Sequence, residues 1–453
     1  IGWSGKAFLS TSCCPKVCIV GSGPAGFYTA QHLIKARQDV EVDIYERLPV
    51  PFGLVRFGVA PDHPENVINT FTQTAKHSRC SFYGNVNVGK DVTVGELQQA
   101  YHAVVLSYGA EGNRRVGVPG EDLRGVYTAK DFVGWYNGLP SCRELSPDLS
   151  CETAVILGQG NVALDVARIL LSPLDTLKKT DITQPALEVL AESQVRKVLI
   201  VGRRGPMQVA CTIKDPVETA CFRMAPPCGK RLTELLMKTA VEVPGDKELE
   251  RRKNATKIWG FRFYRSPTEI FADPSHSRTA GIRLAVNRLE GCGERAQAVL
   301  TGEVEDVSCG LVISSIGYKS LPIDPSVPFD SRRAIVPNSV GRVHQAAGLY
   351  CSGWLKTGPT GVIATTMNNS FDTARSLLED VDSGTLDIST GKPGSQIVSM
   401  LLEERGTLKT RVKPVTFSDW EKIDSLEMRK GEACGKPREK LLTVEEMLKV
   451  ART

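Results

Sequence analysis

The chain has 453 residues, 41% of them hydrophobic, and a formal net charge of +5 at pH 7. This length leaves room for two or three domains with apolar cores of their own. No run of about 18 uncharged apolar residues occurs, which excludes a membrane-spanning helix and leaves only peripheral contact with a membrane. The 13 cysteines form no C-x-x-C pair. This excludes the simplest dithiol redox centre and the zinc-ribbon ligand set, so no metal site is expected, and the scattered spacing is typical of a reducing compartment.

The amino-terminal stretch is basic. Residues 1–38 contain four lysines or arginines and no carboxylate, and serine and threonine are frequent before residue 15. Residues 1–15 therefore have the composition of an organelle transit peptide or its remnant. A frayed terminus with a chance charge bias explains the same composition equally well.

A first nucleotide-binding unit is predicted over residues 16–46. An apolar strand over 16–20 runs into Gly21-Ser22-Gly23-Pro24-Ala25-Gly26, followed by a helical apolar period over 27–34 and a second strand over 40–45. Gly21 allows the tight turn, Gly23 lets a pyrophosphate approach the backbone, and Gly26 permits close helix packing. Glu46 ends the second strand, where a carboxylate accepts hydrogen bonds from both ribose hydroxyls and repels a 2′-phosphate. The unit therefore indicates FAD or NAD, although Glu46 alone also fits a plain surface acid.

A second unit is predicted over residues 153–204. A strand over 153–157 leads into Gly158-Gln159-Gly160-Asn161-Val162-Ala163, then a helix over 164–171 and a return strand over 197–201. After the return strand, where an acid is expected, the chain has Gly202-Arg203-Arg204. Two guanidinium groups can clamp a 2′-phosphate, which favours NADP(H) over NAD. A solvated arginine pair is the alternative.

Two units of this kind predict an α/β fold with two doubly wound nucleotide-binding domains. Apolar strands over 103–109 and 310–317 both end in glycine, and we interpret them as the borders of an inserted domain. The expected FAD-binding domain consists of residues 16–110 and 319–453, and the NADP-binding domain of residues 111–318 is inserted into it. Residues 321–329, with three prolines, are expected to form an extended linker.

A third glycine-rich segment lies near the carboxyl terminus. The stretch from Ser352 through Gly353-Trp354 to Gly361-Val362-Ile363 leads from a strand into a predicted helix. Free amides at that helix start are able to bind the ring edge or phosphates of a flavin, and Trp354 is able to stack on a ring. Packing in a core is an equally common role for one tryptophan.

Several long motifs together resemble one known family. They are VGSGPAGFY at residues 20–28, PFGLVRFGVAPDHP at 51–64, GQGNVALDVAR at 158–168, and Gly353-Trp354 with Gly358-Pro359-Thr360-Gly361. Over nearly the whole chain, the sequence resembles the mitochondrial NADPH:adrenodoxin oxidoreductase family. The resemblance implies electron transfer from NADPH through FAD to a two-iron two-sulfur ferredoxin, adrenodoxin, in the mitochondrial matrix. It also implies service to steroid-hydroxylating cytochromes and to iron–sulfur cluster assembly.

The resemblance also implies which residues bind the two nucleotides. FAD contacts are expected from Ala25, Glu46, Leu54, Val88, Trp354, Gly361, Val362 and Ile363, and NADP contacts from Gln159, Gly160, Asn161, Val162, Arg203 and Arg204. The family has a glutamate after Thr-Ile-Lys, whereas this chain has Asp215, whose shorter side chain is expected to weaken a nucleotide contact. A helical stretch of the family is missing between Asp215 and Lys230, which bears on whether the NADP domain folds and binds.

Two titratable residues are candidates for catalysis. By resemblance, His63 and Asp165 are expected where nicotinamide meets flavin, orienting each other and handling the flavin proton. A loop histidine that caps the turn at Pro64 is an equally good interpretation of His63.

The charge distribution predicts an acidic partner. Residues 230–265 contain ten lysines or arginines and five acids, so their net charge equals that of the whole chain. Concentrated positive charge accelerates association with an acidic protein, here a ferredoxin. Nucleic acid is not expected, because no zinc-finger, RRM or aromatic stacking pattern accompanies these cations. A solvated helix face is the alternative, and the protein is expected to be a monomer with peripheral inner-membrane contact at most.

Other functions share a double-nucleotide architecture. A pyridine-nucleotide disulfide reductase is one, and the missing C-x-x-C argues against it. A glutamate synthase-type electron-input subunit is another, and a non-enzymatic NADP-binding protein is a third. A flavin absorption spectrum separates the last from the enzymes.

Overall fold

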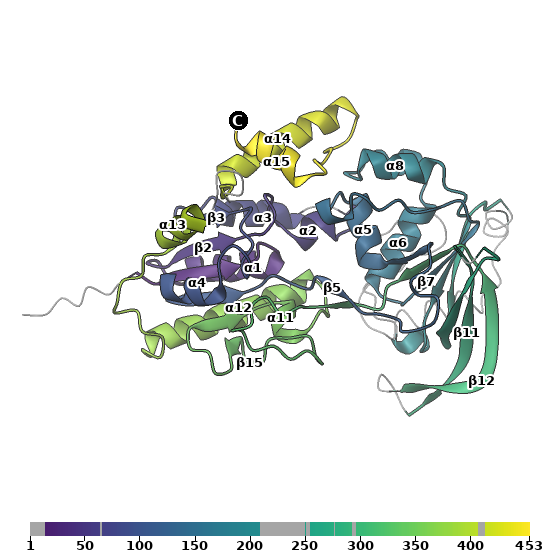
Figure 1. Cartoon of the computed structure of the whole chain (residues 1–453), viewed down its shortest axis with the longest axis horizontal. Helices are drawn as coiled ribbons and strands as arrows, with labels where there is room; N and C mark the ends of the chain where they lie inside the picture. The colour runs from purple at the N-terminus through teal and green to yellow at the C-terminus, as the bar shows by residue number, and fades with distance from the viewer. Residues whose placement is uncertain are drawn as a thin grey trace, which may run out of the picture.

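The computed structural model describes residues 14–63, 66–208, 250, 254–275, 277–291, 296–405 and 413–453. Two lobes lie side by side, one built around a large central sheet and the other around a smaller sheet with a long hairpin beyond it (Figure 1). The buried apolar side chains cluster separately around the two sheets. Each lobe therefore has its own core.

The larger sheet has seven strands in the order β15-β16-β17-β4-β1-β2-β3. The five strands from β17 to β3 are parallel, and β16 and β15 extend this sheet antiparallel. Its strands are β1 (Lys16–Val20), β2 (Glu41–Tyr45), β3 (Cys80–Tyr83), β4 (Ala103–Leu106), β15 (Asn338–Ser339), β16 (Arg342–Val343) and β17 (Leu349–Cys351). The sheet thus joins two parts of the chain that lie far apart in sequence.

Both faces of this sheet are covered, as parallel sheets require. In β1, Val17 and Ile19 face the core shared with α1 and α12, whereas Cys18 and Val20 face the core shared with α4 and α13. The helices of this lobe are α1 (Pro24–Ala36), α2 (Leu54–Phe57), α3 (Asn66–Ala75), α4 (Val94–Ala100), α11 (Trp354–Thr357), α12 (Ile363–Asp382), α13 (Ser395–Arg405), α14 (Phe417–Ala433) and α15 (Val444–Ala451). Helix α1 starts with Pro24 at its first position, which suits a helix start because proline has no amide hydrogen to satisfy there.

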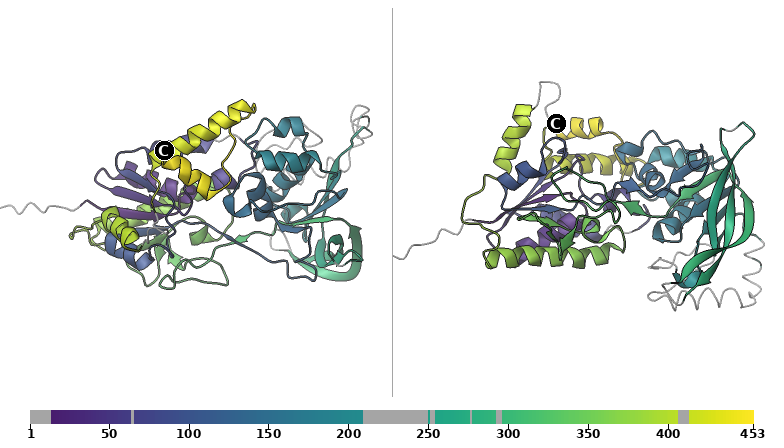
Figure 2. Two further views of the ribbon diagram at one scale, coloured as in Figure 1. Left: turned by 45° about the horizontal axis from the view of Figure 1, so that its top comes forward. Right: turned by 60° about the horizontal axis from the view of Figure 1, so that its bottom comes forward.

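The second sheet is parallel throughout, in the order β6-β13-β7-β8-β9. Its strands are β6 (Val126–Thr128), β7 (Thr153–Leu157), β8 (Lys197–Val201), β9 (Ile258–Arg262) and β13 (Leu311–Ser314). Its helices are α5 (Ala129–Tyr136), α6 (Asn161–Leu171), α7 (Leu174–Leu177) and α8 (Gln184–Ala191), with short 3-10 turns at Pro140–Cys142 and Pro206–Gln208. A separate antiparallel sheet consists of β10 (Arg265–Ala272), β11 (Thr279–Glu290) and β12 (Gln297–Ser308). Its two long strands, β11 and β12, form the long hairpin at the far end of this lobe (Figure 2).

The lobes are connected by two chain segments that pair with each other. Strand β5 (Gly112–Asn113) leaves the first lobe and β14 (Tyr318–Lys319) returns to it, and the two pair antiparallel.

The predicted fold class, two doubly wound domains with one inserted into the other, is confirmed. We propose that the β5–β14 ribbon marks the domain borders. Residues 320–329 contain neither helix nor strand, in agreement with the expected linker.

Five of the described cysteines are buried free thiols: Cys18, Cys80, Cys142, Cys309 and Cys351. Burial raises the pKa of Cys309 and of Cys351 to about 12, so both thiols stay protonated. Among the described helices, none is both long and apolar enough to cross a membrane.

Candidate active site between the two domains

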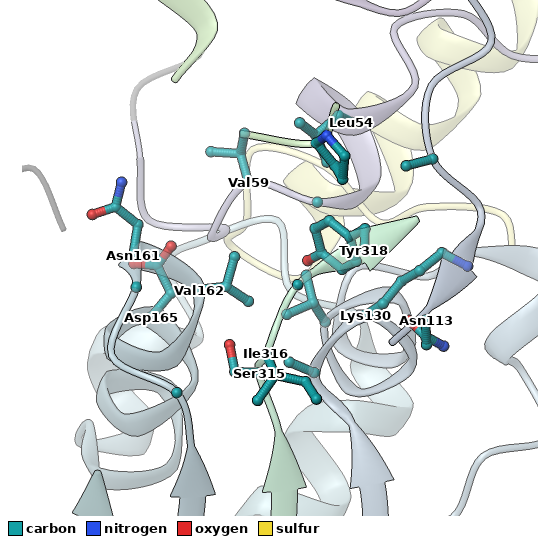
Figure 3. A pocket seen from close by; sticks show the side chains of 18 of the residues that line it. Leu54, Val59, Asn113, Lys130, Asn161, Val162, Asp165, Ser315, Ile316 and Tyr318 are labelled. Carbon is teal, nitrogen blue, oxygen red and sulfur yellow. The ribbon is translucent and has the colours of Figure 1, made fainter. Parts of the chain in front are cut away.

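A large cavity lies between the lobes, at the carboxyl ends of both parallel sheets. Its volume is about 3620 Å³, several times that of a pocket for one small ligand. In Figure 3, Tyr318 lies in the middle, with Leu54 and Val59 on one side and the start of α6 on another. Doubly wound sheets bind nucleotides at this edge.

The structure brings nearly all of the predicted site residues to this cavity. The lining includes Gly21, Gly23, Ala25, Glu46, Leu54, His63, Val88, Gln159, Gly160, Asn161, Val162, Asp165, Arg203, Arg204, Trp354, Gly361, Val362 and Ile363. Gly26 lies behind the lining, and Asp215 lies outside the described residues.

The first glycine turn forms a cradle with no room for side chains at its base. Gly21 has a φ of +106°, and a Cβ on it would lie 2.7 Å from the carbonyl oxygen of Ser107. A Cβ on Gly26 would lie 2.1 Å from the carbonyl oxygen of Gly21, whereas one on Gly23 would meet nothing within 4 Å. Gly23 caps α1 and lines the cavity, so the positive end of this helix faces the cavity. The first turn of α1 carries no acid that would offset this charge. The cradle fits a pyrophosphate.

The Glu46 carboxylate is fixed at the end of β2. Its Oε2 accepts from the Ser22 amide at 3.0 Å and the Ser22 hydroxyl at 2.7 Å, and its Oε1 accepts from the Leu48 amide at 3.1 Å. A carboxylate offers about four acceptor positions, so these contacts leave one, on Oε1, for a ligand. That Glu46 serves both ribose hydroxyls stays a prediction, and this orientation favours the one that reaches Oε1.

The carboxyl-terminal glycine segment completes this half of the cavity. Gly353 has a φ of +66°, and a Cβ on it would lie 2.5 Å from the Ala25 Cβ, so glycine lets α11 approach α1. The Trp354 and Tyr318 rings lie 5.6 Å apart between centroids, and both line the cavity. Burial raises the pKa of Tyr318 to about 12. Its hydroxyl therefore stays protonated at neutral pH and is able to donate a hydrogen bond.

The second glycine turn opens the other half of the cavity. Gly158 has a φ of +120°, Gly160 caps α6, and the first turn of α6 carries no acid. The side-chain nitrogen Nε2 of Gln159 donates to the backbone carbonyl of Gln208 at 3.1 Å, while Gln159 Oε1 is buried without a partner in the described part of the chain. Arg203 is exposed and Arg204 is half-buried after β8, and both line the cavity. This donor set fits a phosphorylated nucleotide.

His63 and Asp165 meet through an arginine. Arg168 Nη2 donates to Asp165 Oδ1 at 2.7 Å and to His63 Nε2 at 3.1 Å, and its other nitrogen pairs with Asp62. Because arginine only donates, His63 Nε2 accepts, which puts the imidazole proton on Nδ1. Burial raises the pKa of Asp165 to about 6, and the nearby His63 opposes this rise. The cluster joins a loop of the first domain to α6 of the second, with His63 Nε2 3.8 Å from Asp165 Oδ1.

Sequence reasoning did not single out four residues of this site. Tyr318, Lys130 and Asn113 line the cavity, and Arg168 connects His63 to Asp165. Tyr318 directly follows Gly317, at the end of a strand already interpreted as a border, so its position gave a usable signal. Lys130 and Asn113 stand in no recognisable motif.

Comparisons with known proteins agree with this architecture. A family model described as pyridine nucleotide-disulphide oxidoreductase matches residues 15–204. The mitochondrial NADPH:adrenodoxin oxidoreductase of Salvelinus fontinalis is 72% identical, covering 99% of this chain and 94% of its own. That of Bos taurus is 60% identical, covering 98% and 94%. The chain belongs to the NADPH:adrenodoxin oxidoreductase family.

A solved structure of a related protein has a similar fold. Mycobacterium tuberculosis FprA in complex with NADPH is 38% identical, with a TM-score of 0.85 over 97% of this chain and 100% of its own. The curated relatives of the family quoted above are named mitochondrial.

Two glycine variants should separate binding from folding. Gly23→Ala places a methyl group in open cavity space, so the apoprotein should keep its unfolding midpoint while its FAD affinity falls at least about tenfold, or about 1.4 kcal/mol. Gly26→Ala drives a methyl group into the Gly21 carbonyl and should lower the unfolding midpoint itself. Flavin titration and thermal unfolding of the apoprotein measure both. Full FAD affinity in Gly23→Ala would show that no phosphate approaches this backbone.

Proposed function

We propose that the protein passes electrons from NADPH through FAD to a two-iron two-sulfur ferredoxin of the adrenodoxin type. The observation that carries this function is one cavity that holds two dinucleotide-binding turns with opposite ribose chemistry. Glu46 disfavours a 2′-phosphate on one side, and Arg203 with Arg204 favours it on the other.

The residues of the two halves have separate tasks. Gly21 and Gly23 cradle the FAD pyrophosphate, Glu46 holds a ribose hydroxyl, and Leu54, Val88, Trp354 and the start of α12 enclose the rest. Gln159, Gly160, Asn161 and Val162 receive the NADP phosphates, and the two arginines hold the 2′-phosphate. When bound, FAD supplies the exchange between two-electron hydride transfer and one-electron transfer to a cluster.

His63 and Asp165 manage protons where the two halves meet. The neutral His63 accepts from Arg168 through Nε2, so protonation at this atom exchanges the arginine contact for attraction to Asp165. An imidazole held at this point is placed to pass a proton to or from the flavin. Asp165 and Arg168 orient the imidazole.

No cysteine belongs to the lining of the cavity in the described part of the chain, so a disulfide reductase mechanism has no thiol to use there. The family name instead supports a ferredoxin acceptor.

We place the protein in the mitochondrial matrix as a monomer with peripheral inner-membrane contact at most. There it serves steroid-hydroxylating cytochromes and iron–sulfur cluster assembly.

The ferredoxin docks on the basic segment 230–265. Most of this segment lies outside the described residues; within them, Arg262 and Arg265 lie beside Glu305, and Lys257 lines the cavity.

The double variant Arg203→Ala/Arg204→Ala tests the NADP site. It should raise the KM for NADPH about ten- to a hundredfold per lost charge-assisted contact and leave that for NADH nearly unchanged, because only NADPH has a 2′-phosphate. Arg196→Ala is a matched control, since Arg196 binds the Ser193 and Val195 carbonyls next to the opposite end of β8. Equal losses for both nucleotides would mean that these arginines do not recognise the phosphate.

Charge reversal tests the ferredoxin surface. Changing Arg251, Arg252 and Lys253 together to glutamate should slow ferredoxin reduction at low ionic strength, because each exposed contact is worth only about 0 to 1 kcal/mol but their sum steers encounter. Flavin reduction by NADPH and transfer to a small neutral dye should not change. Rates are compared across salt up to about 0.1 M, where screening reaches about 10 Å. A salt dependence as steep as that of the unmodified protein would place docking elsewhere.

A further inference from the structure

A network of buried and half-buried charges connects the carboxyl-terminal segment to both domains, away from the cavity. Its cations are Arg56, Lys436, Arg438 and Lys440, and its anions are Asp181, Asp424, Glu427 and Glu439. Arg56 belongs to α2 of the FAD domain and Asp181 to the NADP domain, whereas the other six lie between residues 424 and 440. We call this set the C-terminal latch.

The centre of the latch is a fully satisfied carboxylate. Glu427 of α14 is 0% exposed and accepts from Arg56 Nη2 at 2.6 and 2.8 Å, from Arg438 Nη1 at 3.2 Å and from the Leu441 amide at 2.9 Å. These contacts use the acceptor positions that a carboxylate offers. The carboxylate of this buried ion pair has all its partners, although Arg56 Nε has none in the described part of the chain. Moving one of the charged partners would leave a charge uncompensated, so the pair specifies geometry.

A second ion pair reaches into the NADP domain. Lys440 Nζ lies 2.8 Å from Asp181 Oδ2 and donates to the Arg56 carbonyl at 3.2 Å, so one ammonium group contacts both domains. Lys440 has a side chain that is only 1% exposed. Close by, the Gln184 amide donates to Glu439 Oε1 at 2.9 Å and Lys436 donates to the Ile182 carbonyl.

The NADP domain also contacts the same strip of backbone directly. Asn137, fully buried at the end of α5, donates through Nδ2 to the carbonyls of Phe57 at 3.2 Å and Val59 at 3.0 Å. Lys440 and Asn137 thus bind three carbonyls, those of residues 56, 57 and 59. Helix α2 and the loop after it carry Leu54 and His63 into the cavity.

The position of the latch matters because of how the domains are connected. The covalent connections, β5 and β14, form one narrow antiparallel ribbon, and a single ribbon allows one body to pivot against the other. Figure 1 shows α14 and α15 on the upper side of the molecule, away from that ribbon, with α8 of the NADP domain facing them. A contact displaced from a hinge opposes rotation about it.

We propose that the C-terminal latch is a positioning device for hydride transfer, with Lys440 as the positioning residue that holds the NADP domain against α2. This inference rests on the proposed function, since it concerns the approach of the NADP half of the cavity to the flavin half. Lys440 does not touch either nucleotide site. It acts through the backbone that carries Leu54 and His63.

The variant Lys440→Met tests the proposal by keeping most of the length of the side chain, which stays unbranched, and removing its charge. The saturating rate of flavin reduction by NADPH should fall about ten- to a hundredfold, as expected when reacting groups are misplaced by about 1 Å. Flavin content, the Kd for NADPH and reoxidation of the reduced flavin by ferricyanide should stay at their original values. Hydrogen exchange in the protein without NADPH should accelerate in the peptides over 54–60 and 181–187.

Lys76→Met is the matched control. Lys76 pairs with Glu421 of α14 at 2.6 Å, but this ion pair is about half exposed and stays within the FAD domain. This control variant should change neither the rate of flavin reduction by NADPH nor the hydrogen exchange of the peptides over 54–60 and 181–187. Lys440→Met should also lower the unfolding midpoint, because it leaves Asp181 without its partner. The double variant Lys440→Met/Asp181→Asn removes both charges, so it should recover that midpoint while the rate of flavin reduction stays low.

The results separate this proposal from the function on which it rests. If NADPH does not reduce the flavin of the unmodified protein, the proposed function fails, and the exchange comparison still decides whether the latch holds the domains. Rates and exchange equal to those of Lys76→Met would overturn the latch. A raised Kd for NADPH at an unchanged saturating rate would overturn it as well. If Lys440→Met does not fold, Glu439→Gln at the edge of the latch replaces it, with the same outcomes.

Discussion

The carboxyl edges of two parallel sheets face each other across one cavity, and the rest of the molecule depends on this arrangement. Each sheet brings a glycine turn and the positive start of a helix, α1 or α6, to the cavity. Two dinucleotides bound in this way have their reactive ends directed at a shared space. The domain insertion, the β5–β14 ribbon and the C-terminal helices maintain that geometry, so their roles follow from it.

The two halves of the cavity are chemically distinct although they are built alike. Glu46 is immobilised by Ser22 and Leu48, so its negative charge cannot turn away from a phosphate. In the other half, Arg203 and Arg204 follow β8 and line the same cavity. We therefore propose that selection between the nucleotides is electrostatic, because the two glycine turns proposed to hold the pyrophosphates are built alike.

The sequence predicted local structure well where a motif determines it. The return strand at residues 197–201 agrees with β8, and the glycine turns lie where their spacing indicated, because the tight approach at Gly21 and Gly158 excludes other residues. Of the site residues that were missed, Lys130 and Asn113 belong to no motif, whereas Arg168 ends the motif at residues 158–168 and its contact with His63 arises only on folding. Asn137 and Lys440 matter only through contacts made after folding, with partners 78 residues or more away in sequence. The single acceptor position left on Glu46 depends on the orientation of its side chain, which spacing does not fix.

In the proposed function, electrons enter from NADPH at a flavin bound in this cavity. An anaerobic titration of the purified protein with NADPH, followed by its flavin absorption and then by addition of a two-iron two-sulfur ferredoxin, tests it most directly. We expect stoichiometric bleaching of the flavin band by NADPH, slower bleaching by NADH, and return of the band as the ferredoxin is reduced. A protein without a flavin band, or one whose flavin NADPH does not reduce, would contradict it.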